Sequence, residues 1–224
     1  MDTSIKLADQ LAEFKAGSIQ RSAPERIAVM EAATAQLKAG GIESQALKVG
    51  DSAPDLSLPD ALGTSVSLSS LWQVGPLVVI FYRGGWCPYC NLELKAWQGR
   101  LPELKQLGAT LVAISPQSPD NSLSTAQKNE LAFAVLSDSS LQAAESFKIA
   151  FEMAPDLVEL YKKGGNDLPT LNGNGRWVLP VPATYVIDRR GQIVYAHVEA
   201  DYRERAEPED VLAAVARARD PALS

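Results

Sequence analysis

Hydrophobic and polar positions follow two different periods along the chain, and the change comes near residue 45. In the first part, apolar residues recur every three or four positions, as they do on one face of a helix. The residues concerned are Leu7, Leu11, Phe14, Ile27, Met30, Ala33 and Leu37. Gly40 and Gly41 end this pattern, as glycine commonly does at the C-terminus of a helix. We therefore predict helices over residues 4–39, within an N-terminal helical extension of residues 1–45.

After residue 45 the pattern becomes one of short strands separated by turns and helices. Residues 55–58 and 66–68 alternate on either side of a glycine turn and predict a hairpin. The continuous apolar run 77–81 predicts a strand that is covered on both faces. Further strands are predicted at 111–114, 133–136, 185–187 and 192–195, and helices at 119–130, 141–163 and 207–219. Residues 166–180 are predicted to form a loop, because Asn, Gly and Pro gather there.

A helix is predicted to begin shortly after the 77–81 strand. Its buried stripe steps by four and three residues through Cys90, Leu94, Trp97, Leu101 and Leu104. Cys87 lies one turn nearer the exposed tip, and Pro102 is expected to kink or interrupt the helix. Strand, helix and strand in this order predict a right-handed parallel crossover. One mixed sheet with helices on both faces then accounts for residues 46–224, which we expect to be an α/β domain.

Composition narrows the class of protein. The 224-residue chain has a net charge of −6, which argues against nucleic acid as a partner and against a basic membrane-binding face. No apolar run approaches the roughly 20 residues that span a bilayer, so no membrane span is expected. Residues 1–4 lack the features of a secretory signal. We therefore expect a cytoplasmic protein, in which a pair of cysteines would cycle rather than stay oxidised.

The two cysteines of the chain stand at Cys-x-x-Cys spacing, at the predicted turn from strand to helix. Cys87 and Cys90 are close enough in sequence to form a small disulfide, and a helix start lowers the pKa of a thiol placed there. Pro88 suits the first helical position, so Cys87 is expected to be the N-cap. A zinc site would need two more soft ligands, and the chain offers only His197. We therefore expect a redox pair, with neither a metal nor another cofactor.

From about residue 48 to 218 the chain resembles the alkyl hydroperoxide reductase and thiol-specific antioxidant family, the peroxiredoxins. Residues 49–56 with 66–68 are similar to the family's opening hairpin, 134–138 to one of its strands, and 185–191 to its closing hairpin. The resemblance implies a thioredoxin-like α/β fold, with a central mixed sheet flanked by helices. It also implies the reduction of hydrogen or alkyl peroxides, with a thioredoxin, a glutaredoxin or a small thiol as the reducing partner.

The active-site residues depart from the pattern of that family. With Phe81 and Glu93 aligned, the family's peroxidatic cysteine corresponds to Cys90. The family's Thr position then holds Cys87, and its Pro position holds Arg83. Where the family's arginine is expected, before the closing hairpin, the chain has Val-Pro-Ala-Thr instead. The frame thus resembles a peroxiredoxin, while the site lacks two of the residues that the family uses.

The site is similar instead to the active site of thioredoxins and glutaredoxins. The run from Trp86 to Cys90 resembles their motif, and Pro182 resembles their cis-proline. A cis peptide bond before Pro182 would leave the backbone of Val181 free to pair with an extended substrate. The alternative is an ordinary trans proline in a turn. A peroxidase with Cys90 as the attacker and Cys87 as the resolving thiol, or the reverse, is the favoured function. A thiol-disulfide oxidoreductase in which Cys87 attacks, and a sensor whose cysteines only report redox state, are the alternatives.

The remaining candidates each have two interpretations. Arg83 either replaces the family's arginine or faces solvent, and Trp86 would offer a flat contact surface beside the sulfur. Glu93 accepts a proton, anchors a neighbouring arginine, or is an ordinary solvated or salt-bridged carboxylate. His197 is expected to be structural, and the polar cluster Asp201, Tyr202, Arg203 and Arg205 is expected to be a solvated loop. The N-terminal helices are a packing extension, a homodimer interface or a cap over the site.

Overall fold

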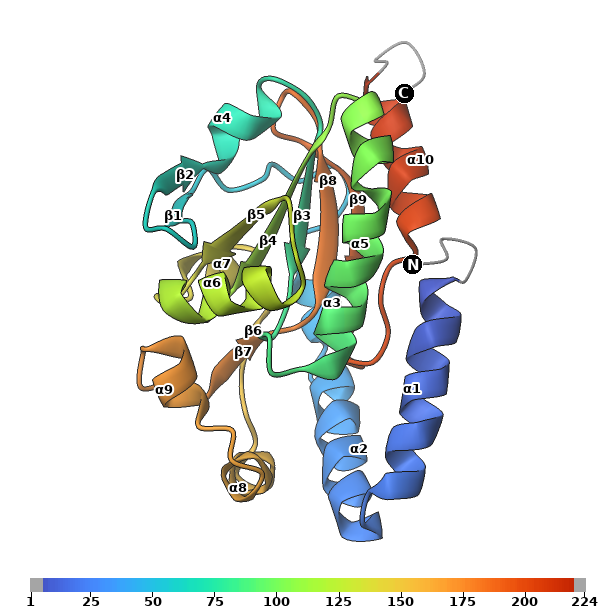
Figure 1. The fold of residues 1–224 in the computed structure, drawn as a ribbon, viewed down its shortest axis with the longest axis vertical. Coiled ribbons are helices and arrows are strands. Elements are labelled where there is room, and N and C mark those ends of the chain that lie inside the picture. The colour runs from blue at the N-terminus through green and yellow to red at the C-terminus, as the bar shows by residue number, and fades with distance from the viewer. Residues whose placement is uncertain (1–5, 220–224) are drawn as a thin grey trace.

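A five-stranded mixed sheet forms the centre of the molecule, with helices on both of its faces (Figure 1). The structure is a computed structural model that describes residues 6–219. Residues 1–4, on which the expectation of no secretory signal rests, and the predicted helical start at 4–5 lie outside the described residues. The strand order is β5-β4-β3-β8-β9. Strands β3, β4 and β5 run parallel, whereas β8 is antiparallel to both β3 and β9, so the predicted mixed sheet is confirmed.

The bounds of the elements agree with most of the predicted ones. The strands are β1 Ser57–Pro59, β2 Ser65–Ser67, β3 Leu77–Phe81, β4 Thr110–Ser115, β5 Ala134–Ser137, β6 Ala150–Glu152, β7 Val178–Pro180, β8 Ala183–Ile187 and β9 Ile193–Val198. The helices are α1 Leu7–Arg21, α2 Pro24–Ala39, α3 Ile42–Gln45, α4 Leu68–Trp72, α5 Pro88–Gln106, α6 Pro119–Lys128, α7 Gln142–Ser146, α8 Pro155–Lys163, α9 Leu168–Asn172 and α10 Pro208–Arg219. Among the helices of the described part of the chain, none is long and apolar enough to cross a membrane.

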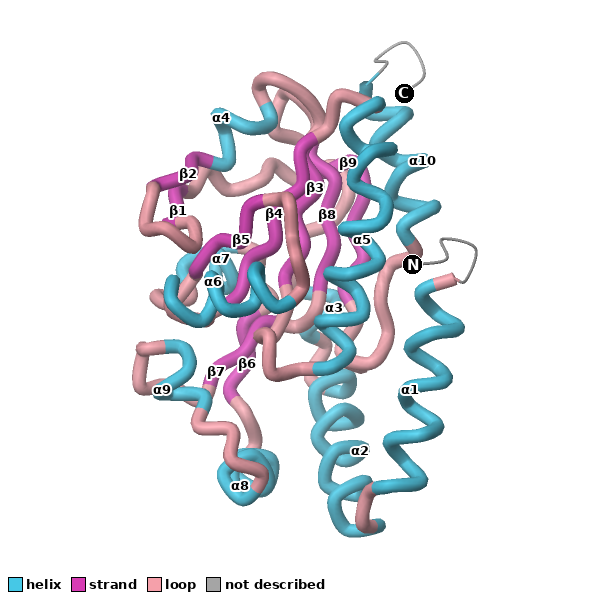
Figure 2. The backbone as a smooth tube through the Cα atoms, in the orientation of Figure 1, coloured by secondary structure: helices cyan, strands magenta, loops and turns pink. Residues whose placement is uncertain are grey.

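The apolar run in β3 is explained by burial on two sides. Leu77, Val79 and Phe81 face one layer, which contains residues of α3, α4 and α7. Val78 and Ile80 face the opposite layer, which contains residues of α5 and α10. Successive side chains of a strand point to opposite faces, so a strand between two helical layers is apolar at every position. Figure 2 shows this central layer of strands in magenta between the helices.

Two segments differ from their predicted structure. Residues 141–163 contain the strand β6 between two helices, and the predicted loop 166–180 contains α9 and β7. β6 and β7 pair with each other in an antiparallel two-stranded sheet outside the central one, with Glu152 opposite Val178. The prediction of a single sheet after residue 45 was therefore wrong, because β1 and β2 also form a hairpin of their own outside the central sheet. β6 and β7 have three residues each, too few for a periodic pattern to identify them, whereas the hairpin of β1 and β2 was predicted from its alternation.

Pro102 does not interrupt α5, which continues for four residues beyond it. A proline inside a helix removes one hydrogen bond and crowds the preceding turn. Leu101 and Leu104, on either side of it, are buried in the core between α5 and α10. Burial of these two side chains offsets the local cost, so packing overrides the proline here.

The N-terminal helices lie beside the end of the sheet at which β3 leads into α5 (Figure 1). α1 packs against α5, and α2 packs against α8. The start of α1 is held by the far end of the chain, because the backbone N–H groups of Leu7 and Ala8 donate to the carboxylate of Glu207. The extension is thus fastened at both its helices to the rest of the molecule.

We expect Leu104→Ala to lower the free energy of unfolding by about 2–5 kcal/mol, because it leaves a cavity in a fully buried layer. The matched control is Leu62→Ala, which removes the same atoms from a side chain that is 79% exposed. This control should change the free energy by no more than about 0.5 kcal/mol. Urea denaturation followed by circular dichroism measures both values. Equal effects of the two substitutions would contradict the layer assignment.

Candidate functional site

The turn from β3 into α5 holds the two cysteines. Cys87 is the N-cap of α5, and Pro88 occupies the first helical position, as predicted. Two glycines make the turn possible. A Cβ on Gly84, whose φ is +147°, would lie 2.3 Å from the indole nitrogen of Trp86, and a Cβ on Gly85 would lie 2.2 Å from the hydroxyl oxygen of Thr125. Only glycine fits such close approaches, so these residues set the path of the chain into the helix.

Both cysteines are free thiols and both are buried. Cys90 belongs to the buried stripe of α5, as predicted, but the expectation that Cys87 lies at an exposed tip was wrong, since it is only 2% exposed. Leu7 and Leu11 of α1 belong to the same apolar cluster as the cysteines. The covering helix comes from a segment almost 80 residues earlier, which is why the local pattern did not predict the burial. Cys87 instead lines a small cavity of about 170 Å³ that is partly open to solvent.

The two thiols differ in acidity. A hydrogen bond with Cys90 lowers the pKa of Cys87 to about 6 against the opposing effect of burial, and the positive charges of Arg83 and Arg205 lower it further. Burial raises the pKa of Cys90, and the adjacent Cys87 thiolate raises it again. The pair therefore carries one proton near neutral pH, held on Cys90 and donated toward the Cys87 sulfur. The sequence left open which thiol is the more acidic, and these contacts favour Cys87.

Arg205 is a site residue that the sequence analysis missed. Its Nη2 lies 3.4 Å from Sγ of Cys90, and its Nε donates to Oε2 of Glu93 at 2.6 Å. The side chains of Arg205 and Glu93 are each 1% exposed. Glu93 thus anchors an arginine, which was one of its predicted roles. Burial raises the pKa of Glu93 to about 7 even though Arg205 opposes that shift.

The expected solvated loop at 201–205 was therefore wrong. Asp201, Arg203 and Arg205 are all buried, and each arginine pairs with a carboxylate from another part of the fold or from the loop itself. Arg203 binds Asp201 and also Glu31 of α2. A charged segment with no periodicity indicates a loop. The carboxylates that pair with these arginines are up to 172 residues away, so the local sequence does not predict that the arginines are buried.

Arg83 is buried rather than exposed, at 3% of its surface, so the alternative in which it faces solvent was wrong. Its guanidinium carbon lies 4.3 Å from the ring centre of Tyr202 and 5.1 Å from that of Trp86, and Nη2 donates to the hydroxyl of Tyr161. These are cation–π distances. Within residues 6–219, no carboxylate pairs with Arg83, and its Nε has no hydrogen-bond partner.

Trp86 lies beside the sulfur, as expected. It lines the small cavity together with Cys87 and makes an edge contact with Tyr161, with ring centres 5.4 Å apart. His197, on β9, is half-buried, and burial lowers its pKa. Its structural role stays a prediction.

Pro182 does not follow a cis bond, because no peptide bond in the described part of the chain is cis. The backbone of Val181 is also not free for a substrate, since its N–H donates to the carbonyl of Ile149 at 2.8 Å. This bond extends the pairing of β6 with β7, which the sequence analysis did not predict. The prediction of a thioredoxin-like turn was therefore wrong, because the bond before Pro182 is trans and the backbone of Val181 is already paired.

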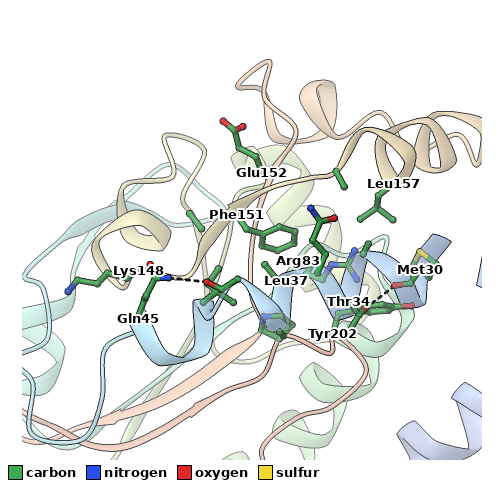
Figure 3. Close-up of a pocket in the computed structure, with 18 of the residues that line it drawn as sticks. Met30, Thr34, Leu37, Gln45, Arg83, Lys148, Phe151, Glu152, Leu157 and Tyr202 are labelled. Atoms are coloured by element: carbon green, nitrogen blue, oxygen red, sulfur yellow. Dashed lines mark hydrogen bonds between the residues drawn. The ribbon is translucent and has the colours of Figure 1, made fainter. Parts of the chain in front are cut away.

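Two cavities meet at Arg83. The small one lies between the N-terminal helices and the cysteine turn. The larger, of about 550 Å³, runs between α2 and the segment from β6 to α8 and includes Pro182 in its lining. Figure 3 shows Leu37 and Phe151 in the middle of this larger cavity, with Arg83 and Tyr202 toward one end and Lys148 toward the other. Arg83, Tyr202 and Met30 line both cavities. Both spaces depend on the N-terminal extension for one wall, as the cap interpretation expects.

The sequence is similar to known proteins over most of its length. A model of the AhpC/TSA family matches residues 49–196. Peroxiredoxin Bcp of Escherichia coli (strain K12) is 35% identical over 103 residues, which are 46% of this chain and 65% of that protein. The chain therefore spans just under two thirds of the length of that relative. Peroxiredoxin Q, chloroplastic, of Sedum lineare is 27% identical over 164 residues, which are 72% of this chain and 75% of that protein.

Solved structures have the same fold. Peroxidoxin BcpB from Mycobacterium tuberculosis superposes with a TM-score of 0.60 at 23% identity, covering 75% of this chain and 96% of that one. A peroxiredoxin-like protein from Aquifex aeolicus gives a TM-score of 0.62 at 17% identity, covering 77% and 88%. The predicted thioredoxin-like α/β fold is confirmed. Since the family model covers more than half of the chain, from residue 49 through the cysteine turn and into the last strand of the central sheet, this chain belongs to the AhpC/TSA family.

Proposed function

We propose that the chain is a thiol-dependent peroxidase in which the Cys87 thiolate attacks the peroxide and Cys90 resolves the product. The observation that carries this proposal is the pair of buried thiols between two arginines: Arg205 lies 3.4 Å from the Cys90 sulfur, and Arg83 lines the same cavity as Cys87. Membership of a family whose relatives are named peroxiredoxins supports the same reaction. A site that needs reduction after each turnover fits a reducing compartment such as the cytoplasm.

In the first step, the Cys87 sulfur attacks one oxygen of the peroxide, and the O–O bond breaks. Cys87 becomes a sulfenic acid, and the second oxygen leaves as water or an alcohol after taking up a proton. Arg83 is a buried cation of the small cavity with no carboxylate partner among the described residues, so it stabilises the negative charge that develops on the departing oxygen. Donors that are already in place when the charge develops lower the barrier most.

In the second step, Cys90 condenses with the sulfenic acid, which releases water and forms the Cys87–Cys90 disulfide. Cys90 must lose its proton to react, and Arg205 at 3.4 Å stabilises the resulting thiolate. Glu93 holds Arg205 in this position through the 2.6 Å ion pair. Over both steps one peroxide and two thiols give one disulfide, one water and one further water or alcohol.

Exchange with a protein disulfide, the alternative function, has less support. The Cys-Pro-Tyr-Cys motif at the start of α5 is suited to it. However, Cys87 is covered by the N-terminal helices, and the backbone at Val181 is already paired. An extended polypeptide would have to displace both of these before it reached the sulfur.

Serine substitutions distinguish the roles of the two thiols. Reduced wild-type protein mixed rapidly with hydrogen peroxide should change its tryptophan fluorescence as the disulfide forms, because Trp86 adjoins the site. Cys87→Ser should abolish fast oxidation. Cys90→Ser should keep the first step, stop at a sulfenic acid that dimedone traps, and form no disulfide.

The rate of oxidation by hydrogen peroxide distinguishes a peroxidase from a thiol that reacts only because its pKa is low. At pH 7 a pKa near 6 raises the thiolate fraction only about 30-fold over a free cysteine of pKa about 8.5. Oxidation no faster than this would contradict the peroxidase proposal. Fast oxidation that survives Cys87→Ser and is lost in Cys90→Ser would assign the attack to Cys90, as the alignment with the family suggests.

A further prediction concerns pH. Because the pKa of Cys87 is lowered to about 6, its thiolate is present above pH 6 and is lost as the pH falls below it. The ultraviolet absorbance of the thiolate should therefore titrate with a midpoint near pH 6. Arg83→Gln and Arg205→Gln should each move the midpoint upward, whereas Arg189→Gln, an exposed arginine on the β8–β9 turn, should leave it unchanged. A wild-type midpoint near 8.5 would contradict the assigned acidity.

A further inference from the structure

The small cavity beside Cys87 is lined by an excess of positive charge. Its lining includes four cationic side chains and a single carboxylate: Lys15, Arg26, Arg83, Arg203 and Glu31. Lys15 pairs with Glu204, and Arg203 pairs with both Glu31 and Asp201, so among the described residues Arg26 and Arg83 are the lining cations without a carboxylate partner. The whole chain has a net charge of −6, so the cavity is opposite in sign to the molecule. A cavity lined by one sign of charge concentrates small ligands of the other sign.

Arg83 lies buried in this cavity, and within the described residues no carboxylate neutralises it. Its remaining neighbours are aromatic rings and the Tyr161 hydroxyl, and its Nε has no partner in the described part of the chain. A buried charge is costly unless it is paired. In the reduced protein the Cys87 thiolate supplies a negative charge that interacts with Arg83. Oxidation to the disulfide removes that charge and leaves Arg83 unpaired.

The covered position of the disulfide limits what can reduce it. Cys87 and Cys90 are 2% and 0% exposed, and the helices α1 and α2 form part of the cavity wall. The pocket beside Cys87 has a volume of about 170 Å³ and is partly open to solvent. A small molecule fits this space, whereas the active-site loop of a protein reductant would have to displace the helices over Cys87 before it reached the sulfur.

We propose that the Cys87–Cys90 disulfide is reduced by a low-molecular-weight thiol that carries a carboxylate, which pairs with Arg83 while its sulfur reaches Cys87. This inference rests on the proposed function, of which it names the reducing partner. The carboxylate replaces the charge that oxidation removes, so the oxidised form binds the thiol more tightly than the reduced form. A thiol with a longer, peptide-like extension has room in the larger cavity, which begins on the other side of Arg83.

The reaction consumes two thiols in each cycle. The first thiolate attacks Sγ of Cys87, a mixed disulfide forms there, and the Cys87–Cys90 bond breaks. Cys90 leaves as a thiolate stabilised by Arg205 and then takes up a proton. A second thiolate attacks the small-molecule sulfur of the mixed disulfide, which releases a symmetric disulfide and the Cys87 thiolate. Two electrons pass from the two thiols to the protein disulfide.

The test compares thiols that differ in charge but not in size. Protein oxidised with diamide is mixed with 3-mercaptopropionate or 3-mercaptopropanol, and the rates are expressed per thiolate. Diamide makes the disulfide without peroxide, so the result does not depend on peroxidase activity. A charged hydrogen bond contributes about 1.5–3 kcal/mol, so we expect the anionic thiol to react at least about tenfold faster. Mass spectrometry of the trapped intermediate should place the mixed disulfide on Cys87.

Variants of Arg83 show whether this side chain is the cause. In Arg83→Gln the rate ratio of the two thiols should fall close to one, and Arg83→Lys should restore most of it. Arg189→Gln removes an exposed arginine far along the chain and should leave the ratio unchanged. A ratio is independent of any general loss of reactivity in a variant. A ratio that persists in Arg83→Gln would overturn the assignment of Arg83.

Two measurements on the wild-type protein alone are equally decisive. Propionate should inhibit reduction by 3-mercaptopropanol competitively, whereas propanol should not. A bacterial thioredoxin should reduce the disulfide more slowly than 3-mercaptopropionate does at equal thiolate concentration. Faster reduction by thioredoxin, or equal rates with the anionic and neutral thiols, would overturn the proposal. Slow oxidation by peroxide together with a strong anionic preference would refute the peroxidase and leave the thiol site standing.

Discussion

The ion pair between Glu93 and Arg205 is the constraint on which the site depends. It joins α5, which begins with the cysteines, to the segment that follows the last strand of the sheet. Two opposite charges with 1% exposure each are tolerated only when they satisfy one another, so neither side chain can move without leaving a buried charge behind. The pair therefore fixes a cation 3.4 Å from the Cys90 sulfur. The sequence lacks an arginine before the closing hairpin, and Arg205, from the segment after the last strand, lies beside the thiols instead.

Local chemistry made much of the fold predictable. The strand β3 is apolar at every position because it lies between two helical layers, and Pro88 marks the start of α5 because its ring suits the first helical position. The two thiols at that helix start indicate the redox reaction that we propose. Each of these features depends on residues that are neighbours in the sequence, so a pattern of a few residues contains the information.

Features that depend on distant partners could not be predicted in this way. The burial of Cys87 depends on α1, the pairing of Val181 depends on β6, and the position of Arg205 depends on Glu93, 112 residues earlier. The sequence of a polar segment does not distinguish an arginine that is buried from one that is solvated. Arg83 shows the same difficulty, because only the rings of Trp86, Tyr161 and Tyr202 together decide that it faces inward.

Because Glu207 binds the start of α1, the cysteines acquire their complete surroundings only late in the synthesis of the described residues. The helix over the cysteines is held by Glu207, and the arginine beside them is Arg205, so both contributions come from the segment that follows the last strand. During synthesis the N-terminal part emerges first, and a nascent chain that ends before residue 201 lacks both Glu207 and Arg205. Its cysteines then ionise without the neighbouring arginine and cannot be enclosed by a fastened helix. The contribution of Arg205 to the acidity of the site is thus acquired only after residue 205 has been synthesised.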